Sequence, residues 1–234
     1  MSIATNLAAV REQITTAARR AGRDPNDIAL MAVCKTFPAD AILEAYAAGQ
    51  RLFGESRVQE FAEKFTQLAK LPDAEFHMIG HLQSNKTAKA AEIFHAVDSI
   101  DSAKLAQRLN DAAQKAGKTL DFLIEINVGG EEVKSGLAPD SPEIEGILQQ
   151  AGSWGNLHFR GLMTVPPYAE DPEGARPYFR RLRELRDGLA ARSFPAVSLD
   201  MLSMGMSHDF EVAIEEGATC VRIGTAIFGE RHQL

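Results

Sequence analysis

Eight short apolar segments recur along this chain, and a stretch with the periodicity of an amphipathic helix follows each of them. The first segment, 28–34, is too short for a typical helix and lacks polar alternation, which is the pattern of a parallel strand buried on both faces. The other predicted strands are 51–54, 75–79, 96–99, 122–128, 158–163, 198–202 and 220–223. Between strands, apolar residues recur every three or four positions, as in Val58, Phe61, Ala62, Phe65 and Leu68.

This alternation is typical of either a closed (β/α)₈ barrel or an open doubly wound sheet. Eight units of about 25 residues match the barrel better, and the first strand is not followed by the Gly-x-Gly-x-x-Gly motif of many open sheets. An extra amphipathic helix precedes the first strand and ends near Gly22. We therefore predict an α/β protein with one domain over 1–234, a (β/α)₈ TIM barrel with an additional N-terminal helix.

The composition argues against nucleic-acid and membrane partners. The 234 residues carry a formal net charge of -7, which opposes attraction to nucleic acid or anionic lipid. No apolar run approaches the roughly 18 residues of a membrane span, and Arg11 and Glu12 interrupt any signal-like start. Cys34 and Cys220 lie in apolar segments without metal-type spacing, so we expect both to be buried and reduced. A cytoplasmic protein is predicted.

Lys35 directly follows the first predicted strand. The carboxyl ends of barrel strands converge on one mouth, where active sites are built. Beside a wholly apolar segment, desolvation favours the neutral amine, which can attack an aldehyde. The alternative is a structural lysine whose stem packs on apolar surface while its amine remains in water. Taken alone, Lys35 fits the structural alternative better.

The ends of the seventh and eighth predicted strands are rich in glycine and hydroxyl residues. In barrels, the loops after these two strands frequently bind phosphate through backbone N–H groups and small hydroxyls. Glycine allows the backbone to approach closely, and hydroxyls can donate to phosphate oxygens. Each residue alone could equally cap a helix or form a turn. Together with Lys35, they predict a phosphorylated aldehyde bound at both ends, and the residues concerned are Ser203, Gly205, Gly224 and Thr225.

Arg222 lies two positions before Gly224, so strand alternation turns both toward the same side. A guanidinium beside a pyridine nitrogen would donate a hydrogen bond to it and disfavour its protonation. The alternative is an arginine paired to a carboxylate inside the barrel, for which Glu55 and Asp200 are candidates.

Six stretches carry a resemblance to a known family. They read Ala-Val-Cys-Lys-Thr at 32–36, Phe-Gly-Glu-Ser-Arg-Val-Gln-Glu at 53–60, His-Met-Ile-Gly-His-Leu-Gln-Ser-Asn-Lys at 77–86, Gly-Leu-Met-Thr at 161–164, Leu-Ser-Met-Gly-Met-Ser at 202–207 and Val-Arg-Ile-Gly-Thr at 221–225. Together they resemble the pyridoxal phosphate homeostasis proteins, whose single barrel is related to the N-terminal domain of alanine racemase. The stretches span nearly the whole chain.

The resemblance implies a pyridoxal 5′-phosphate (PLP) site. Lys35 would carry the cofactor as an internal aldimine, a Schiff base, with phosphate contacts from Ser203, Gly224 and Thr225. Arg222 would lie near the pyridine nitrogen. Further residues expected around the mouth are Ser56, His81, Asn85 and Met163.

The chain departs from its relatives at two positions. Relatives usually have Asn where this chain has Ser56, and many have a second lysine where it has Phe37. Transfer of the cofactor through that second lysine is therefore in doubt. Lys134, in the glycine-rich loop after the fifth strand, resembles a family lysine at the same loop, although a solvated loop lysine is the simpler interpretation.

The resemblance implies binding and delivery of PLP, with little or no catalysis. Moving an α-proton between the two faces of the cofactor requires an acid/base on each side. Alanine racemases take the second group from a tyrosine of another domain, and the three tyrosines here occupy early helix or loop positions. The family also suggests a monomer, with recipient apo-enzymes as possible partners. The alternatives left open are a PLP-dependent amino-acid racemase of this fold type and an aldolase that uses Lys35 without cofactor.

Two further patterns do not predict sites. Acidic residues interleave with the arginines of the stretch 176–187, so we expect a solvated helix there rather than a nucleic-acid surface. His77 and His81 have a helical metal spacing but straddle a predicted strand end without a carboxylate to complete the set, and no metal is predicted.

Overall fold

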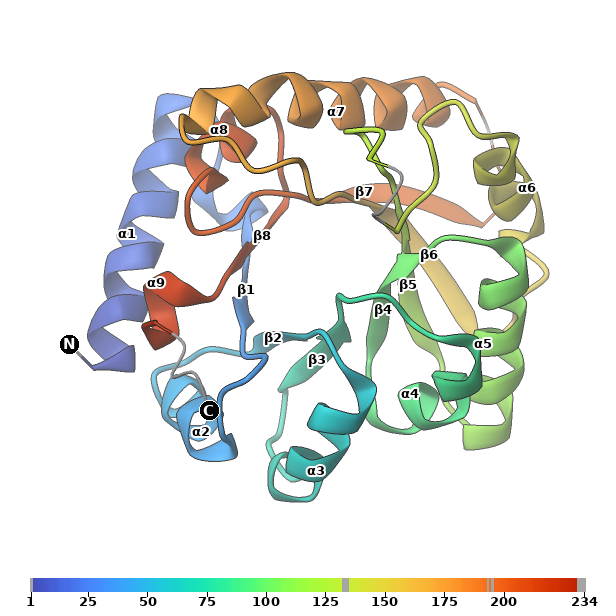
Figure 1. Ribbon diagram of the computed structural model, residues 1–234, viewed down its shortest axis with the longest axis horizontal. Coiled ribbons are helices and arrows are strands. Elements are labelled where there is room, and N and C mark those ends of the chain that lie inside the picture. The colour runs from blue at the N-terminus through green and yellow to red at the C-terminus, as the bar shows by residue number, and fades with distance from the viewer. Residues whose placement is uncertain (1, 132–134, 193, 195, 231–234) are drawn as a thin grey trace.

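The computed structural model describes residues 2–131, 135–192, 194 and 196–230. Its strands form one closed, all-parallel barrel in sequence order, which confirms the predicted fold class (Figure 1). Parallel pairing of the first and last strands closes it, with Ala29 opposite Cys220 and Ala32 opposite Ile223. The strands are β1 (Ala29–Val33), β2 (Leu52–Glu55), β3 (Glu75–Met78), β4 (Ala96–Ile100), β5 (Leu120–Glu125), β6 (Leu157–Met163), β7 (Val197–Ser203) and β8 (Cys220–Ile223).

Helices surround the barrel on its outside (Figure 1). They are α1 (Ile3–Arg20), α2 (Ala39–Ala47), α3 (Val58–Leu68), α4 (Thr87–Ile93), α5 (Ala103–Ala116), α6 (Pro142–Ala151), α7 (Arg176–Ala190), α8 (Phe210–Glu215) and α9 (Thr225–Phe228). Short 3₁₀ helices are η1 (Pro25–Asp27), η2 (Ser84–Lys86) and η3 (Pro172–Ala175). The extra N-terminal helix α1 contacts α2, α8 and α9, and thereby covers the junction between the first and last strands. None of the helices in the described part of the chain combines the length and apolar character that a membrane crossing needs.

Local signals explain where the helices begin and end. Helix α5 begins after Ser102, whose hydroxyl accepts a hydrogen bond from the Leu105 N–H, and ends at Gly117 in the left-handed region. Helix α6 has the same kind of serine cap at Ser141, followed by Pro142, whose missing N–H costs nothing in the first turn. Capping residues of this kind fix the helix lengths, and with them the loops at the mouth of the barrel.

One strand ends earlier than predicted. The sequence predicts a strand over 122–128, whereas β5 ends at Glu125. Beyond it, Ile126 forms an isolated bridge to Leu137, and Asn127 binds the backbone of Gly130 and Glu131. The apolar run continues past the strand because the loop is itself buried, so hydrophobicity alone does not reveal where the strand ends.

The core between the barrel and its helices is rich in aromatic rings. Phe53 of β2 stacks on Phe76 of β3, and Phe76 packs against Phe61 of α3, which also stacks on Phe94 at the end of α4. Ring centroids in this cluster are 4.8–5.4 Å apart, and all four side chains are buried. Such pairs add to the free energy gained from burying apolar area. The cluster fixes α3 against the strands whose ends form one side of the mouth.

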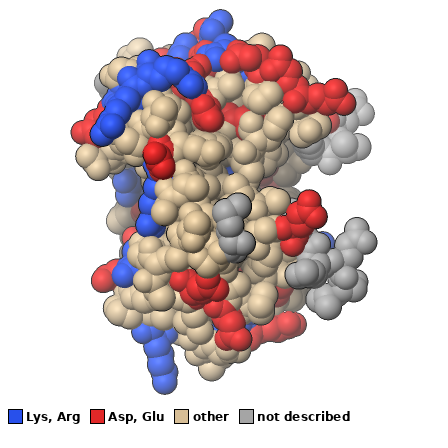
Figure 2. Space-filling view, turned by 90° about the vertical axis from the view of Figure 1, so that its left-hand side faces the viewer, with Lys and Arg blue, Asp and Glu red and all other residues tan. Residues whose placement is uncertain are grey.

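Three arginines of α7 form ion pairs, and the outer face of the helix is exposed to solvent as the sequence predicts. Arg176, Arg180 and Arg183 all contact Glu216, whose side chain is only 4% exposed, at 2.8–3.1 Å. Arg176 also bridges to Glu215, which Arg20 of α1 contacts as well. Basic and acidic side chains accordingly lie side by side at the upper edge of the face in Figure 2. The network joins α1, α7 and α8.

The barrel interior holds a charged pair. His77 of β3 lies with its Nδ1 3.1 Å from Oδ1 of Asp98 in β4, and its Nε2 is 3.8 Å from Oε2 of Glu75. Burial lowers the pKa of His77, but the carboxylates of Asp98 and Glu75 outweigh that effect and raise it to about 9.

Among the described residues, no cluster of three or more His, Cys, Asp or Glu side chains forms a candidate metal site.

The His77 pair predicts how stability depends on pH. The folded protein binds this proton more tightly than the unfolded chain, so the stabilisation is complete below about pH 6.5 and is lost as the pH rises through about 9. The stabilisation that is lost when His77 gives up its proton is about 3 kcal/mol. Burial also raises the pKa of Cys220 to about 12 and that of Cys34 well above its usual value, so the thiols of the folded protein stay neutral while those of the unfolded chain ionise above about pH 8.5, which adds a further loss of stability at higher pH.

Urea unfolding between about pH 6 and pH 8 measures the His77 effect, because the thiols of the unfolded chain remain largely protonated there. The wild type should lose stability across that range, and His77→Gln should lose much less. An equal change of the free energy of unfolding with pH in the two proteins would contradict the prediction.

Candidate functional site

A cavity of about 310 Å³ lies at the mouth of the barrel, where loops after several strands meet. It contains five of the residues that the sequence singled out: Lys35, Ser56, Arg222, Gly224 and Thr225. The other lining residues are Val33, Phe37, Ile79, Gly80, Val165, Met206, Ser207 and His208. A larger hollow of about 530 Å³ lies between α6 and α7 on the helical outside, but it gathers no lysine and none of the glycine and hydroxyl loops. The mouth cavity is therefore the candidate site.

Lys35 enters the cavity from a tight turn after β1. The Phe37 N–H donates to the Cys34 carbonyl at 3.2 Å, which closes the turn, and Lys35 itself is partly buried. Phe37, at the position where relatives often have a second lysine, also lines the cavity, and its ring stacks on Phe228 with centroids 5.0 Å apart. The β1 side of the mouth thus offers one amine beside an aromatic wall.

Gly224 and Thr225 lie next to this turn because β8 pairs with β1. A Cβ on Gly224 would lie 3.2 Å from the Val33 carbonyl oxygen, so a larger residue would press on the backbone of β1. Thr225 opens α9 with its side chain exposed at the cavity. These positions give the mouth a hydroxyl and a glycine-bordered surface close to Lys35.

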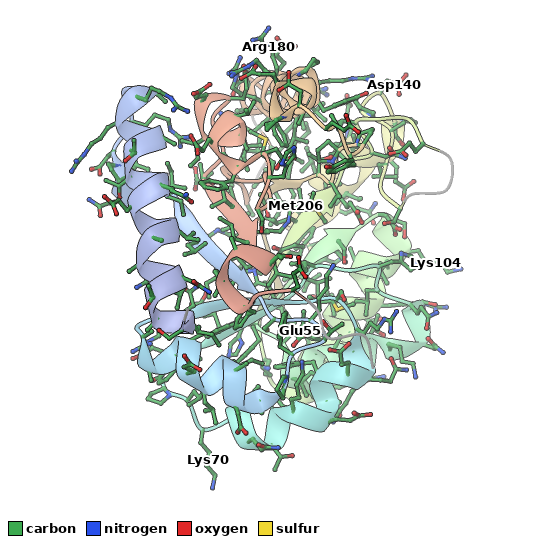
Figure 3. All side chains as sticks on the ribbon, turned by 60° about the vertical axis from the view of Figure 1, so that its left-hand side comes forward. Glu55, Lys70, Lys104, Asp140, Arg180 and Met206 are labelled. Carbon is green, nitrogen blue, oxygen red and sulfur yellow. The ribbon has the colours of Figure 1, made fainter. Side chains whose placement is uncertain are left out.

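The loop after β7 reaches the cavity with different residues from those predicted. Ser203 is fully buried, and Gly205 has a φ of 93° and packs under α8, where a Cβ would lie 2.6 Å from that of Ala213. Gly205 turns the chain so that the residues after it, Met206, Ser207 and His208, face the cavity. Asp209 holds this turn, since its carboxylate accepts a hydrogen bond from the Met206 N–H at 2.6 Å (Met206 is labelled in Figure 3).

The sequence contains a signal for Met206, Ser207 and His208, which were not predicted to line the cavity. Ser207 follows a glycine by two positions, and a glycine in the left-handed region redirects the residues after it. The hydroxyl that the loop after β7 presents to the cavity is therefore that of Ser207, while Ser203 supports the site from below.

Arg222 connects this buried serine to the cavity. Its Nη1 donates to Ser203 Oγ at 2.7 Å, and its Nη2 donates to the Thr164 carbonyl at 2.6 Å. Both acceptors are neutral. The two carboxylates considered as partners bind elsewhere: Glu55 accepts from Lys64, and Asp200 accepts from Ser198.

The charge of Arg222 persists in the barrel. Burial lowers the pKa of its guanidinium, and the carboxylates of Asp98, Glu125 and Asp209 oppose that effect. An arginine side chain remains cationic in proteins under these conditions. The cavity floor is therefore positively charged.

Besides Ser203 and Gly205, three more predicted site residues lie outside the cavity lining. Met163 is fully buried at the end of β6, opposite Ser203 in the ladder. His81 lines an adjoining hollow that also contains Ser56, and its Nδ1 is 3.5 Å from Oδ2 of Asp101. Asn85 lies exposed in η2. Lys134 lies outside the described residues.

The loops after β2 and β3 approach each other very closely at the mouth. A Cβ on Gly80 would lie 2.4 Å from the Ser56 carbonyl oxygen, and the Gly80 carbonyl accepts a hydrogen bond from Ser99 Oγ at 2.6 Å. Only glycine lets the loop after β3 pass this close to the loop that carries Ser56.

Replacing this glycine should disturb the mouth. Gly80→Ala places a methyl group against backbone, and we expect the free energy of unfolding in urea to fall by about 1–3 kcal/mol. Gly146→Ala is the matched control, because a Cβ there meets no atom within 4 Å and alanine favours the helix. Equal effects of the two substitutions would show that the close approach at Gly80 is unimportant.

Comparisons with known proteins agree with the fold. Residues 5–232 match the family described as alanine racemase, N-terminal domain. The pyridoxal phosphate homeostasis protein of Aquifex aeolicus is 48% identical over 231 residues, covering 99% of both chains. Its counterpart in Pseudomonas aeruginosa is 46% identical, covering 98% of this chain and 96% of its own.

Solved structures give the same assignment. PipY of Synechococcus elongatus PCC7942, solved with PLP bound, is 38% identical, with a TM-score of 0.84, and the match covers 97% of this chain and 100% of PipY. An alanine racemase of Clostridium difficile is 15% identical with a TM-score of 0.72, and the match covers 98% of this chain and 56% of the racemase, which shows a shared fold only. The chain therefore belongs to the family of pyridoxal phosphate homeostasis proteins, built on the barrel of the alanine racemase N-terminal domain.

Proposed function

We propose that this protein binds PLP covalently through Lys35 and presents it to recipient apo-enzymes, with little turnover of its own. The observation that carries the proposal is that one cavity brings the amine of Lys35 together with the glycine and hydroxyl residues that follow β7 and β8. This arrangement supports holding a phosphorylated aldehyde at both ends. We expect the protein to act in the cytoplasm as a monomer, as the sequence predicts.

The residues at the mouth fit the phosphate of PLP. Ser207 and Thr225 offer hydroxyl donors, and Gly224 keeps the surface between them free of a side chain. The positive charge of Arg222 favours an anionic ligand in the same cavity. Bound PLP supplies an aldehyde for the lysine and a ring able to accept electrons. Lys35 holds the aldehyde end, while the two loops orient the phosphate.

Arg222 explains why turnover should be low. Two of its five N–H donors are used on Ser203 and Thr164, and the side chain still lines the cavity. A cationic donor facing the ring nitrogen disfavours protonation of that nitrogen, so the ring withdraws electrons less strongly from a bound amine. A regulatory role in PLP supply suits this arrangement better than amino-acid chemistry does.

The tyrosines also favour the carrier function over a racemase. None of them lines the cavity in the described part of the chain. Tyr46 donates to the Pro72 carbonyl on the outside, Tyr178 packs against the core, and Tyr168 is 79% exposed beside His208. Among the described residues, the cavity lining therefore offers no tyrosine as a second acid/base beside Lys35.

The covalent linkage can be tested by colour and by peptide mapping. Purified wild type incubated with PLP and then freed of unbound PLP should absorb in the visible range, and borohydride should fix a phosphopyridoxyl group on the peptide that contains Lys35. Lys35→Ala should remain colourless, because its side chain lacks the amine. Lys86→Ala, which removes a lysine from the adjoining hollow, is the matched control and should keep the colour. A wild type that stays colourless in PLP would overturn the proposal.

Turnover is tested separately. We expect the α-proton signal of L-alanine or L-serine to persist when the PLP-loaded protein is incubated with either amino acid in deuterated water. Loss of that signal at enzymatic rates would instead establish a racemase or a related enzyme.

A further inference from the structure

The turn that carries Lys35, residues 34–37, adopts an unfavourable backbone conformation. Thr36 has a φ of 69°, in the left-handed region that glycine normally occupies. A β-branched residue is especially disfavoured there, because its side chain crowds the backbone. Such a conformation persists only when surrounding contacts enforce it. The turn therefore needs an anchor.

A buried lysine of helix α3 supplies one part of that anchor. The Nζ of Lys64 donates to the Phe37 carbonyl at 3.0 Å and to the Cys34 carbonyl at 3.5 Å. These two carbonyls belong to the first and last residues of the turn. The Lys64 side chain is only 11% exposed, so water competes weakly for these bonds.

A glutamate on the same helix supplies the second part. The Thr36 N–H donates to Oε1 of Glu60 at 2.5 Å, and Lys64 Nζ lies 3.4 Å from the same oxygen. Glu60 thus binds the strained residue itself and is in turn paired with the lysine one helical turn away. Backbone groups on both sides of Lys35 are consequently fixed to α3.

Glu55 at the end of β2 explains why Lys64 is held in place. It is fully buried (labelled in Figure 3), and its Oε1 lies 2.6 Å from Lys64 Nζ and 3.3 Å from the Cys34 thiol, which donates to it. Burial lowers the pKa of Lys64, but the carboxylate of Glu55 outweighs that effect and raises it above its usual value. Lys64 is therefore a cation at neutral pH and serves as a hydrogen-bond donor.

We propose that Lys64 and Glu60 are positioning residues, which hold the turn 34–37 in its left-handed form so that the Lys35 amine faces the mouth cavity. The proposal rests on the function of Lys35 proposed above. It assigns a role to a buried cluster that contacts the turn of the cofactor lysine without lining the cavity itself. The physical basis is that a strained turn, once anchored, fixes the direction in which the Lys35 side chain leaves the backbone.

The test measures how fast PLP labels Lys35. Wild type, Lys64→Met and Glu60→Ala are mixed with PLP, and the visible absorbance and the borohydride-fixed mass on the Lys35 peptide are followed over time. We expect labelling in both variants to be about tenfold slower. Lys86→Met is the control lysine and should label like wild type.

A second substitution separates positioning from general stability. Glycine adopts a positive φ without steric cost, so Thr36→Gly should restore the labelling rate when combined with Lys64→Met or Glu60→Ala. A purely structural role would lower the melting temperature and leave the rate of the folded protein unchanged. If Lys64→Met does not fold, Glu60→Ala with and without Thr36→Gly decides the question, because alanine removes the acceptor of the Thr36 N–H and the Glu60 side chain is 26% exposed.

The outcomes distinguish the two proposals. A wild type that is never labelled overturns the function proposed for Lys35. A wild type labelled at Lys35, together with Lys64→Met and Glu60→Ala labelled at the same rate, overturns the positioning role alone. Slower labelling that Thr36→Gly fails to restore also overturns it, because the strained turn would then not be what the two residues hold.

Discussion

Parallel pairing between β1 and β8 closes the barrel, and the site depends on that closure. It places the turn that carries Lys35 beside the loop that carries Gly224 and Thr225, although these residues lie at opposite ends of the chain. The fit is close, because a side chain at Gly224 would press on the Val33 carbonyl. Helix α1 covers the same junction from outside. The amine and the hydroxyl-lined surface therefore form one cavity only in the closed barrel.

Two buried cations support the mouth in different ways. Arg222 donates hydrogen bonds to two neutral oxygens and remains at the cavity, where its charge acts on a ligand. Lys64 is paired with Glu55 and binds backbone carbonyls below the cavity. A buried ion pair gains little net stability, because removing both charges from water costs about as much as their attraction returns. The Lys64–Glu55 pair is better understood as fixing one conformation of the turn beside it.

Much of the fold is visible in the sequence for a simple physical reason. A parallel strand covered by helices is largely apolar, so a strand such as β1 is a short apolar run between helical patterns, although other strands carry charged residues such as His77 and Asp98 into the barrel interior. The ends are less visible, as the early end of β5 at Glu125 shows, because a buried loop can be as apolar as a strand. The arginines of α7 illustrate another limit. Their pattern indicated a solvated helix, and only the fold shows that Glu216 of a distant segment binds three of them.

The barrel, the lysine after its first strand and the loops that accompany it can be predicted from the amino-acid order, because they follow from periodicity and from short local motifs. Which residue of each motif faces the cavity depends on the folded chain. Gly205 turns its loop so that Ser207 lines the mouth and Ser203 binds Arg222 below it. Folding also brings Lys64 and Glu60 of α3 against the turn at Thr36. Backbone direction within a loop, and contacts between segments far apart in the chain, arise only once the strands have paired.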